Sequence, residues 1–408
     1  MTTDQHHLPS DEQTRLGSLT NPAFLACVIL GAVALLTGFV LGGLQGDQGR
    51  YFFHAYLTSY AFVLSIALGG LFFTALQHVS RAGWSVTVRR LAELLAAPMP
   101  WLAMLFLPLL VPLFLDGHVL YEWTDAELVA ADPILAGKAP YLNVPAFILR
   151  AVVYFAVWIW LSRFFLRLSV AQDSSADPAL TLRMERLSPL ALILFAFTVT
   201  FASFDWIMSL TPHWFSTIFG VYYFSGAVVA ALSMMILAAW GLQATGRLRN
   251  AITVEHYHDL GKLLFAFLFF WGYIAFSQYM LIWYANIPEE TAWYLPRQTG
   301  SWRTVSLVLL IGGLLVPFVG LISRVPKRNK SMLAFWAVWL MVAHWLDVFY
   351  LVMPSFGGER LPLGLIDVAL TVGLTSVYLA AVVAAASGRE LVARGDPRLD
   401  ESLAFENL

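Results

Sequence analysis

The sequence contains a single cysteine, Cys27, and charged residues make up only 12% of its 408 positions. One cysteine excludes a disulfide framework, a Cys-ligated iron–sulfur cluster and a C-x-x-C-H haem site within this chain. Paired axial histidines for a membrane haem are also lacking, because His54, His78 and His344 are expected at different membrane depths. The chain is therefore expected to carry no redox cofactor and no metal of its own.

Several common signatures of soluble proteins are missing as well. No P-loop, H-E-x-x-H or G-x-S-x-G motif occurs, so soluble-type hydrolytic chemistry is not indicated. The formal net charge is −2 and no basic arm is present, so nucleic acid is not an expected partner. The polar first ~20 residues lack the layout of a secretory signal, so no cleaved signal peptide is expected.

Hydrophobic residues, in contrast, make up 59% of the chain and gather in ten long stretches. Each stretch holds roughly 18–26 residues, and a membrane-spanning helix needs about 20. The predicted spans are Pro22–Gly43, Ala55–Gln77, Pro98–Leu115, Asn143–Leu168, Pro189–Leu210, Thr217–Gly241, Lys262–Ala285, Thr304–Ile322, Met332–Met353 and Leu363–Ala386. No soluble fold can bury ten such segments, so the sequence predicts an all-α polytopic membrane protein with about ten transmembrane helices.

Lysine and arginine are distributed unequally between the two sets of alternating loops. The side with both chain ends has 18, the other side has five, and Arg150 lies inside a helix. The larger set is Arg15, Arg81, Arg89, Arg90, Arg163, Arg167, Arg183, Arg186, Arg247, Arg249, Lys262, Arg324, Lys327, Arg328, Lys330, Arg389, Arg394 and Arg398; the smaller is Arg50, Lys138, Arg297, Arg303 and Arg360. Cytoplasmic loops carry the basic excess, so both termini are expected in the cytoplasm.

A short internal similarity indicates two related halves. Asp205 precedes Pro212, and Asp347 precedes Pro354, by seven residues near the end of a predicted helix. The motifs lie 142 residues apart, which spans four helices and returns the chain to the same side. We predict two four-helix bundles, although coincidence also accounts for so short a match. The predicted segments are a tail 1–21, helix 1 within 22–54, bundles 55–216 and 217–362, helix 10 at 363–386, and a tail 387–408.

Two outer loops, Asp116–Leu142 and Asn286–Arg303, are rich in tryptophan and tyrosine. Such rings are common at the membrane interface, and the same loops are candidates for docking a partner outside the membrane.

Two charges fall inside neighbouring predicted helices of the first bundle. Arg150 lies about two turns into the fourth helix, and Asp205 lies in the last turns of the fifth. A lone charge near the bilayer centre costs at least about 2.5–3.5 kcal/mol, so such groups pair or line a wet path. We predict an Arg150–Asp205 pair, which either holds the bundle together or contributes to a polar path.

A second set of ionisable residues predicts a proton path through the other bundle. His344 and Asp347 are three residues apart and share a helix face, and Asp367 enters from the same outer side. Histidine titrates near neutral pH, so this set can pass protons. A histidine satisfied within the core is the alternative interpretation.

The inner mouth of this path is predicted at the start of the seventh helix. Glu255, His258, Asp259 and Lys262 follow a helical spacing and face one way. A solvated electrostatic cluster is the competing interpretation. Ser277 and Gln278 are predicted to lie between the inner and outer groups, where they could hydrogen-bond water or a ligand.

Three segments resemble one family of membrane proteins. They are HYHDLGKLLFAFLFFWGYIAFSQYMLIWYANIPEET at His256–Thr291, YLNVPAFILRAVVYFAVWIWLSR at Tyr141–Arg163, and SFDWIMSLTPHWFSTIFGVYYFSG at Ser203–Gly226. They are similar to the smaller membrane-anchor subunit of alternative complex III, a bacterial quinol:electron acceptor oxidoreductase, within the polysulfide-reductase (NrfD-like) membrane-anchor family. The resemblance extends over about residues 20–390.

The resemblance implies ten helices in two four-helix bundles with two peripheral helices, in the bacterial inner membrane. It implies partners: a homologous larger membrane anchor, a periplasmic iron–sulfur subunit, c-type cytochrome subunits and lipids. Haem c and iron–sulfur clusters would belong to those partners, and quinol or menaquinol is a possible ligand. The subunit would be accessory, with a proton path and an uncertain quinone site. A secondary transporter and a purely structural scaffold stay open as alternatives.

Overall fold

The computed structural model describes residues 8–407, except for Ser10, Gly46, Gln48, Asp116–His118 and Glu359. Over these residues the chain is all-α, 80% helical and without strands. Ten helical segments are long and apolar enough to cross a membrane. The predicted class, a ten-helix polytopic membrane protein, is confirmed. The beginning of the predicted loop at Asp116 and parts of the two predicted tails lie outside the described residues.

The first half of the chain contains α1 Thr20–Gly43, α2 Arg50–Val79, α3 Val86–Ala96, α4 Met99–Phe106, η3 Leu107–Phe114, α5 Ala126–Ala131, α6 Pro133–Lys138, α7 Val144–Ser175 and α8 Pro178–Trp206. The second half contains α9 Phe219–Ala244, α10 Val254–Ala285, α11 Pro288–Thr291, α12 Gly300–Val308, the π-helix η7 Leu309–Leu315, α13 Val316–Ile322, α14 Arg324–Arg328, α15 Lys330–Val352, α16 Leu365–Ala386 and α17 Leu399–Leu403. Short 3-10 turns are η1 Gly17–Leu19, η2 Gly83–Ser85, η4 Glu122–Thr124, η5 Met208–Leu210, η6 Pro296–Gln298 and η8 Met353–Phe356.

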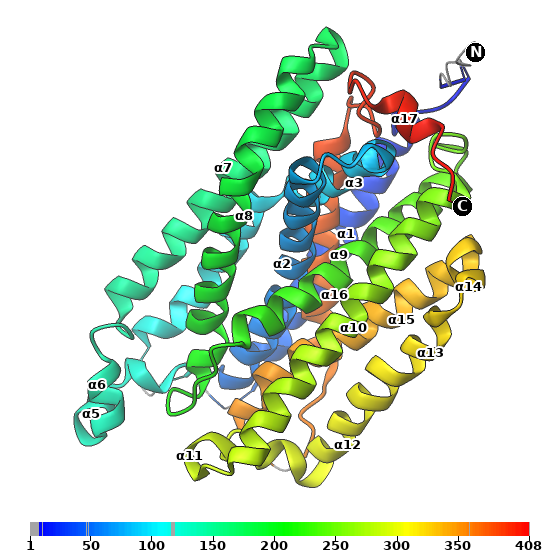
Figure 1. Cartoon of the computed structure of the whole chain (residues 1–408). Helices are drawn as coiled ribbons and strands as arrows, with labels where there is room; N and C mark the ends of the chain where they lie inside the picture. The colour runs from blue at the N-terminus through cyan, green and yellow to red at the C-terminus, as the bar shows by residue number, and fades with distance from the viewer. Residues whose placement is uncertain are drawn as a thin grey trace.

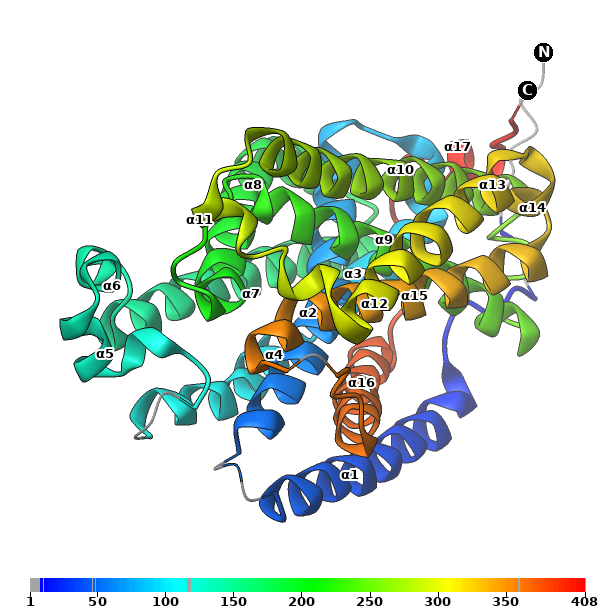
Figure 2. The same cartoon turned by 90° about the horizontal axis from the view of Figure 1, so that it is seen from below.

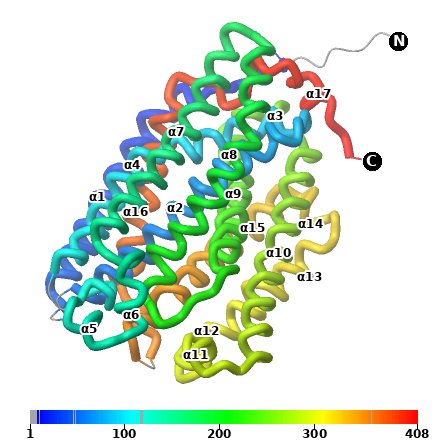
Figure 3. The backbone as a smooth tube through the Cα atoms, turned by 60° about the vertical axis from the view of Figure 1, so that its left-hand side comes forward, coloured from blue at the N-terminus to red at the C-terminus, as the bar shows by residue number. Residues whose placement is uncertain are grey.

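The long helices run side by side, and both ends of the chain lie at the same end of the bundle (Figures 1 and 3). We call this the terminal end. The short helices α5, α6 and α11 lie at the opposite end, which we call the distal end. Seen from below, α1 lies at the edge of the molecule against α16 (Figure 2). Most of α1 is exposed, as expected for a helix that faces lipid.

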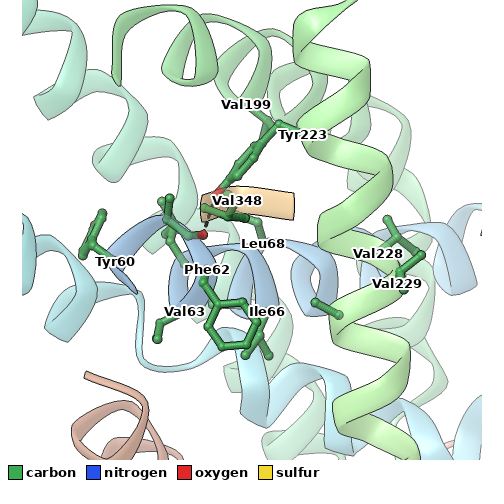
Figure 4. Close-up of a cluster of buried hydrophobic side chains, with 14 of the residues drawn as sticks. Tyr60, Phe62, Val63, Ile66, Leu68, Val199, Tyr223, Val228, Val229 and Val348 are labelled. Carbon is green, nitrogen blue, oxygen red and sulfur yellow. Dashed lines mark hydrogen bonds between the residues drawn. The ribbon is translucent and has the colours of Figure 1, made fainter. Parts of the chain in front are cut away.

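Helices α2 and α9 form the centre of the molecule. α2 packs against α3, α8, α9, α15 and α16, and α9 packs against α8, α10 and α15. Figure 4 shows side chains of both helices in this core, where Tyr223 reaches from α9 to α2. Its hydroxyl donates to the carbonyl of Ala61 at 2.7 Å. The division into two repeated bundles stays a prediction.

The third membrane segment begins earlier than predicted. The expected span was Pro98–Leu115, but the helical segment runs from Gly83 to Phe114 and includes α3. The charged residues of α3 lower its hydropathy, so it was not predicted as part of a membrane span. Every residue of α3 is nevertheless buried, because its charged side chains form ion pairs inside the protein. The helix breaks between α3 and α4 at Pro98, which cannot donate a backbone hydrogen bond.

The eighth segment is interrupted by the π-helix η7. Such insertions widen the helix and leave carbonyls without their usual partners. The indole of Trp339 in α15 donates to the carbonyl of Gly312 at 2.7 Å and satisfies one of them. η7 packs against α15, and its Gly313 lines a small cavity together with Trp271 and His344.

Gly69 allows α2 and α9 to approach closely. A Cβ at this position would lie 2.2 Å from the carbonyl oxygen of Ala227 and 2.6 Å from the Cβ of Ala231. The first contact is with backbone, which cannot rotate away. Small residues at helix crossings serve this purpose in membranes.

Gly69→Ala is therefore expected to destabilise the protein by about 1–3 kcal/mol or more, because α2 and α9 must separate. Thermal unfolding in mild detergent measures the effect. Gly241→Ala in α9 is the matched control, since nothing lies within 4 Å of the added Cβ. The control should be neutral or stabilised by up to about 1 kcal/mol. Equal stability of the two variants would contradict the close packing.

Candidate functional site

Asp347 in α15 is the centre of a buried polar cluster in the second half of the chain. Its side chain is 2% exposed. The hydroxyl of Tyr222 in α9 donates to Oδ1 at 2.5 Å, and the indole of Trp271 in α10 donates to Oδ2 at 3.1 Å. Three helices thus converge on one carboxyl group, and both of its contacts are with neutral donors. Among the described residues, no cation forms an ion pair with Asp347.

His344 lies one turn before Asp347 and connects the cluster to α2. Its Nε2 lies 2.8 Å from the hydroxyl oxygen of Ser65, which in turn donates to the carbonyl of Phe62 at 2.6 Å. A Cβ on Gly226 would lie 2.7 Å from the His344 ring, so this glycine lets the imidazole lie against α9. The histidine is therefore a hydrogen-bonded core residue that also belongs to the cluster of Asp347.

A small cavity adjoins both His344 and Trp271. Residues of α9, α10, η7 and α15 line it, and they include Gly226 and Gly313. About 20 Å³ is open to the centre of a water molecule, which is room for one water. Because the cavity touches the imidazole and the indole that binds Asp347, a water here would lie between two polar side chains of the cluster.

Asp205 in α8 has the same local sequence pattern as Asp347 but a different environment. Arg150 in α7 binds it through two hydrogen bonds, from Nε at 2.8 Å and from Nη2 at 3.0 Å. The hydroxyl of Tyr154 donates to the same carboxylate at 2.7 Å. The guanidinium also stacks on Tyr141 at 3.9 Å and donates to its carbonyl. The predicted partners are thus in contact, and Arg150 is the counter-ion of Asp205.

Asp367 does not join the cluster of Asp347. It lies in the first turn of α16, where it accepts a hydrogen bond from the backbone N–H of Gly364 at 2.8 Å. The hydroxyl of Tyr51 in α2 also donates to it. Its second oxygen, Oδ1, is buried without a partner. This geometry is that of a capping carboxylate, which stabilises the exposed N–H groups at a helix start.

The predicted inner mouth lies at the terminal end and binds the C-terminal segment. Glu255 pairs with Arg328 and accepts a hydrogen bond from Asn407. Lys262 pairs with Asp259 and donates to the side chain of Asn407 at 2.9 Å. These contacts tie the start of α10 to the end of the chain.

His258 belongs to the same inner group but is held less directly. Its Nδ1 lies 3.9 Å from Oδ1 of Asp259, beyond hydrogen-bonding distance. His258 therefore has a buried ring nitrogen without a hydrogen-bond partner among the described residues.

Gln278 and Ser277 lie nearer the distal end than Trp271, so they are not between the inner group and the cluster of Asp347. Gln278 accepts from Ser216 at 2.8 Å and donates to Tyr294 at 3.1 Å, which are both distal-end residues. It lies about 10 Å beyond Trp271 along α10, because each residue advances the helix by about 1.5 Å. Ser277 is its half-buried neighbour. The predicted apolar span began at Lys262, whereas α10 begins at Val254.

An apolar stretch separates the inner group from the cluster of Asp347. Asp259 and Trp271 are about 18 Å apart along α10. The buried face between them carries Leu260, Leu264 and Leu268. Proton transfer over this distance requires ordered water, because these side chains offer no donor or acceptor.

Arg297 is a buried cation that the sequence analysis treated as a loop residue. It is 1% exposed and donates to the carbonyls of Trp293 at 2.7 Å and Leu351 at 3.2 Å. The guanidinium stacks 3.4 Å from the Trp293 ring. Burial lowers the pKa of Arg297 to about 10. It therefore remains charged at neutral pH.

A buried ionic network at the terminal end was also missed. Arg90 is fully buried and donates to Asp173 at 2.9 Å and Glu93 at 3.0 Å. Arg89 pairs with Asp396 at 2.5 Å, so α3 is bound to both α7 and the C-terminal segment. The signal in the sequence was the unbroken helical pattern through Arg89, Arg90 and Glu93, which the hydropathy criterion rejected.

Glu390 joins the two ends of the chain at the edge of this network. It accepts from Thr14 at 2.5 Å and from Arg15 at 2.8 Å. Burial opposes its charge, but the Thr14 hydrogen bond and the Arg15 ion pair outweigh burial and lower the pKa of Glu390. The contact therefore stabilises the fold above the ordinary carboxyl pKa and loses that contribution as the pH falls through the lowered value.

Among the described residues, no group of three or more histidine, cysteine, aspartate or glutamate side chains could hold a metal ion. No protein-family model matches the chain. Comparison with curated proteins finds no match either. The chain is an integral multi-pass membrane protein. Among its buried carboxyl groups, Asp205 is bound to an arginine, whereas Asp347 is bound only to neutral donors.

Proposed function

We propose that this chain is a membrane subunit of a bacterial quinol-oxidising electron-transfer complex, and that it takes up and releases protons at Asp347. The redox centres belong to partner subunits: an iron–sulfur protein and c-type cytochromes on the periplasmic side, beside a larger membrane anchor. The basis for these partners is the resemblance of the three sequence segments to alternative complex III. Quinol or menaquinol is the expected electron donor of the complex.

The observation that carries the proposal is the environment of Asp347. A buried carboxylate normally has a counter-ion, as Asp205 has Arg150. Asp347 instead meets the hydroxyl of Tyr222 and the indole of Trp271. No cation is paired with it among the described residues, and the imidazole of His344 and a water-sized cavity lie one turn away. A group that can change its protonation state inside the membrane is a functional candidate.

The basic excess supports an orientation in which the terminal end faces the cytoplasm. His258 and the surrounding charges of α10 then lie at the cytoplasmic surface, and Asp347 lies in the periplasmic half. Protons would cross the intervening leucine-lined stretch of α10 along ordered water. The aromatic segments near Trp123 and Trp293 would face the partner subunits on the periplasmic side.

The assembly is tested by purification through a tag on this chain in mild detergent. Haem staining and mass spectrometry should detect c-type haem and iron–sulfur subunits bound to it. The reason for this expectation is that the sequence has one cysteine and no C-x-x-C-H motif, so the redox centres of the proposed complex would belong to partner subunits. Recovery of a haem-free protein with substrate transport activity would reject the proposal in favour of a secondary transporter.

Reporter fusions test the orientation. A fusion after Arg328, in the loop between α14 and α15, should be active with a cytoplasmic reporter and silent with a periplasmic one. A fusion between Asp125 and Lys138, in the region of α5 and α6, should behave in the opposite way. The expected contrast follows from the unequal charge of the two loop sets. Reversed signals at both positions would place the termini in the periplasm.

A further inference from the structure

Three arginines at the terminal end line an open groove and have no carboxylate partner among the described residues. Arg163 and Arg167 are exposed on one face of α7, and Arg389 lies just after the end of α16. None of the three forms an ion pair with a described residue, whereas Arg15, Arg81, Arg90, Arg394 and Arg398 at the same end do. Arg389 has one local hydrogen bond, to the carbonyl of Ala385.

The groove combines this charge with an apolar floor. Leu166, Val170 and Ala171 complete its lining, and its volume is about 470 Å³. A second groove of about 460 Å³ shares Arg163 and Arg167 and continues down α7 over Ile159, Trp160 and Phe164. The two together form a cationic mouth above an apolar track along one helix, which we call the arginine groove.

The arginine groove lies where the membrane surface is expected. About 20 residues of helix span the ~30 Å hydrocarbon core, and 20 residues counted from the distal start of α7 reach Arg163. Arg389 follows the last residue of α16, Ala386, by three positions. The three guanidinium groups therefore approach the level of lipid headgroups, and the apolar track points into the hydrocarbon region.

We propose that the arginine groove binds an anionic phospholipid, with its phosphate at Arg163, Arg167 and Arg389 and an acyl chain along α7. Arginine binds phosphate oxygens through two parallel hydrogen bonds, which suits a phosphodiester. A zwitterionic lipid would leave much of the cationic charge uncompensated. An apolar track beneath the charges favours an amphiphile over a soluble anion. This inference does not depend on the proposed redox role.

Native mass spectrometry of the full-length chain, delipidated and then titrated with lipid, tests the proposal. Phosphatidylglycerol should bind more tightly than phosphatidylcholine with identical acyl chains. The triple variant Arg163→Gln/Arg167→Gln/Arg389→Gln should lose roughly fivefold in phosphatidylglycerol affinity per arginine, on the order of 100-fold in all, and lose the preference. The matched control Arg183→Gln/Arg186→Gln/Arg324→Gln removes three exposed arginines outside the groove and should bind as the wild type does.

Several outcomes would overturn the proposal. They are equal binding of the two lipids by the wild type, an unchanged triple variant, and an equal loss in the control, which would indicate only general surface charge. Displacement of the lipid by millimolar inorganic phosphate would assign the site to a soluble anion. Lipid binding to the isolated chain but not to the purified assembly would assign the groove to a protein partner. If the triple variant fails to fold, Arg163→Gln alone should show the fivefold loss.

Discussion

Replacing Asp205 with asparagine is expected to destabilise the protein by roughly 3–5 kcal/mol, because the change leaves Arg150 as an unpaired cation inside the helix bundle. The carboxylate is completely buried and accepts both arginine hydrogen bonds and that of Tyr154. Asparagine has the same size but no charge, and its amide N–H group would face the guanidinium. The loss should appear as a lower thermal unfolding midpoint in detergent and a lower yield of assembled protein.

Two further variants separate the ion pair from a general effect of the substitution. Asp347→Asn makes the same change at a buried carboxyl without an arginine. It should lower the stability of the protein by only about 1–2 kcal/mol, because one hydrogen bond is mismatched. Arg150→Met combined with Asp205→Asn removes the stranded cation and should recover much of the lost stability. If Asp205→Asn were as stable as the wild type, the pair would contribute nothing to the fold.

On the proposed function, Asp347→Asn is expected to reduce proton-coupled quinol oxidation by roughly 10²-fold, the lower range of what a positioned acid–base group contributes. The reason is that asparagine keeps the size of the side chain but cannot take up or release a proton. The complex should still assemble, since no ion pair is broken. Proton release and quinol oxidation would be measured together on one reconstituted preparation of the purified assembly.

Tyr222→Phe and Asp367→Asn serve as companion variants. Tyr222→Phe removes the hydroxyl that donates to Asp347 while the carboxyl remains, so a smaller loss of turnover is expected. Asp367→Asn alters the cap of α16 and should lower stability without changing protons released per electron. Wild-type proton release and turnover in Asp347→Asn would leave this chain as a scaffold.

The membrane architecture followed from the sequence because a bilayer imposes a simple requirement. About 20 apolar residues must be contiguous, and such runs are visible without knowing any contact. The same criterion failed at α3, where Arg89, Arg90 and Glu93 are buried. Hydropathy counts each residue alone, and it cannot include partners such as Asp173 and Asp396, which lie far away in the chain.

The predictions for the site residues differ for the same reason: depth was predicted, but contacts across the bundle were not. Arg150 and Asp205 were paired correctly from their depths on neighbouring antiparallel helices. Asp367 was grouped with Asp347 by depth alone, but it meets Tyr51 and the start of α16 instead. The depth of a residue in the membrane follows from its position along its helix, so it can be predicted from the sequence. The direction in which a side chain points across the bundle depends on how helices pack.

Asp205 and Asp347 show the limit of what can be predicted from the sequence. Each is followed seven residues later by a proline near a helix end, so the two are alike in the sequence. Only the tertiary structure sets Arg150 against the first, and Tyr222 and Trp271 against the second. The sequence by itself determined the helices and the depth of each carboxyl. Packing decided which carboxyl has a counter-ion, because the partners come from helices distant in the chain and a buried charge depends on its contacts.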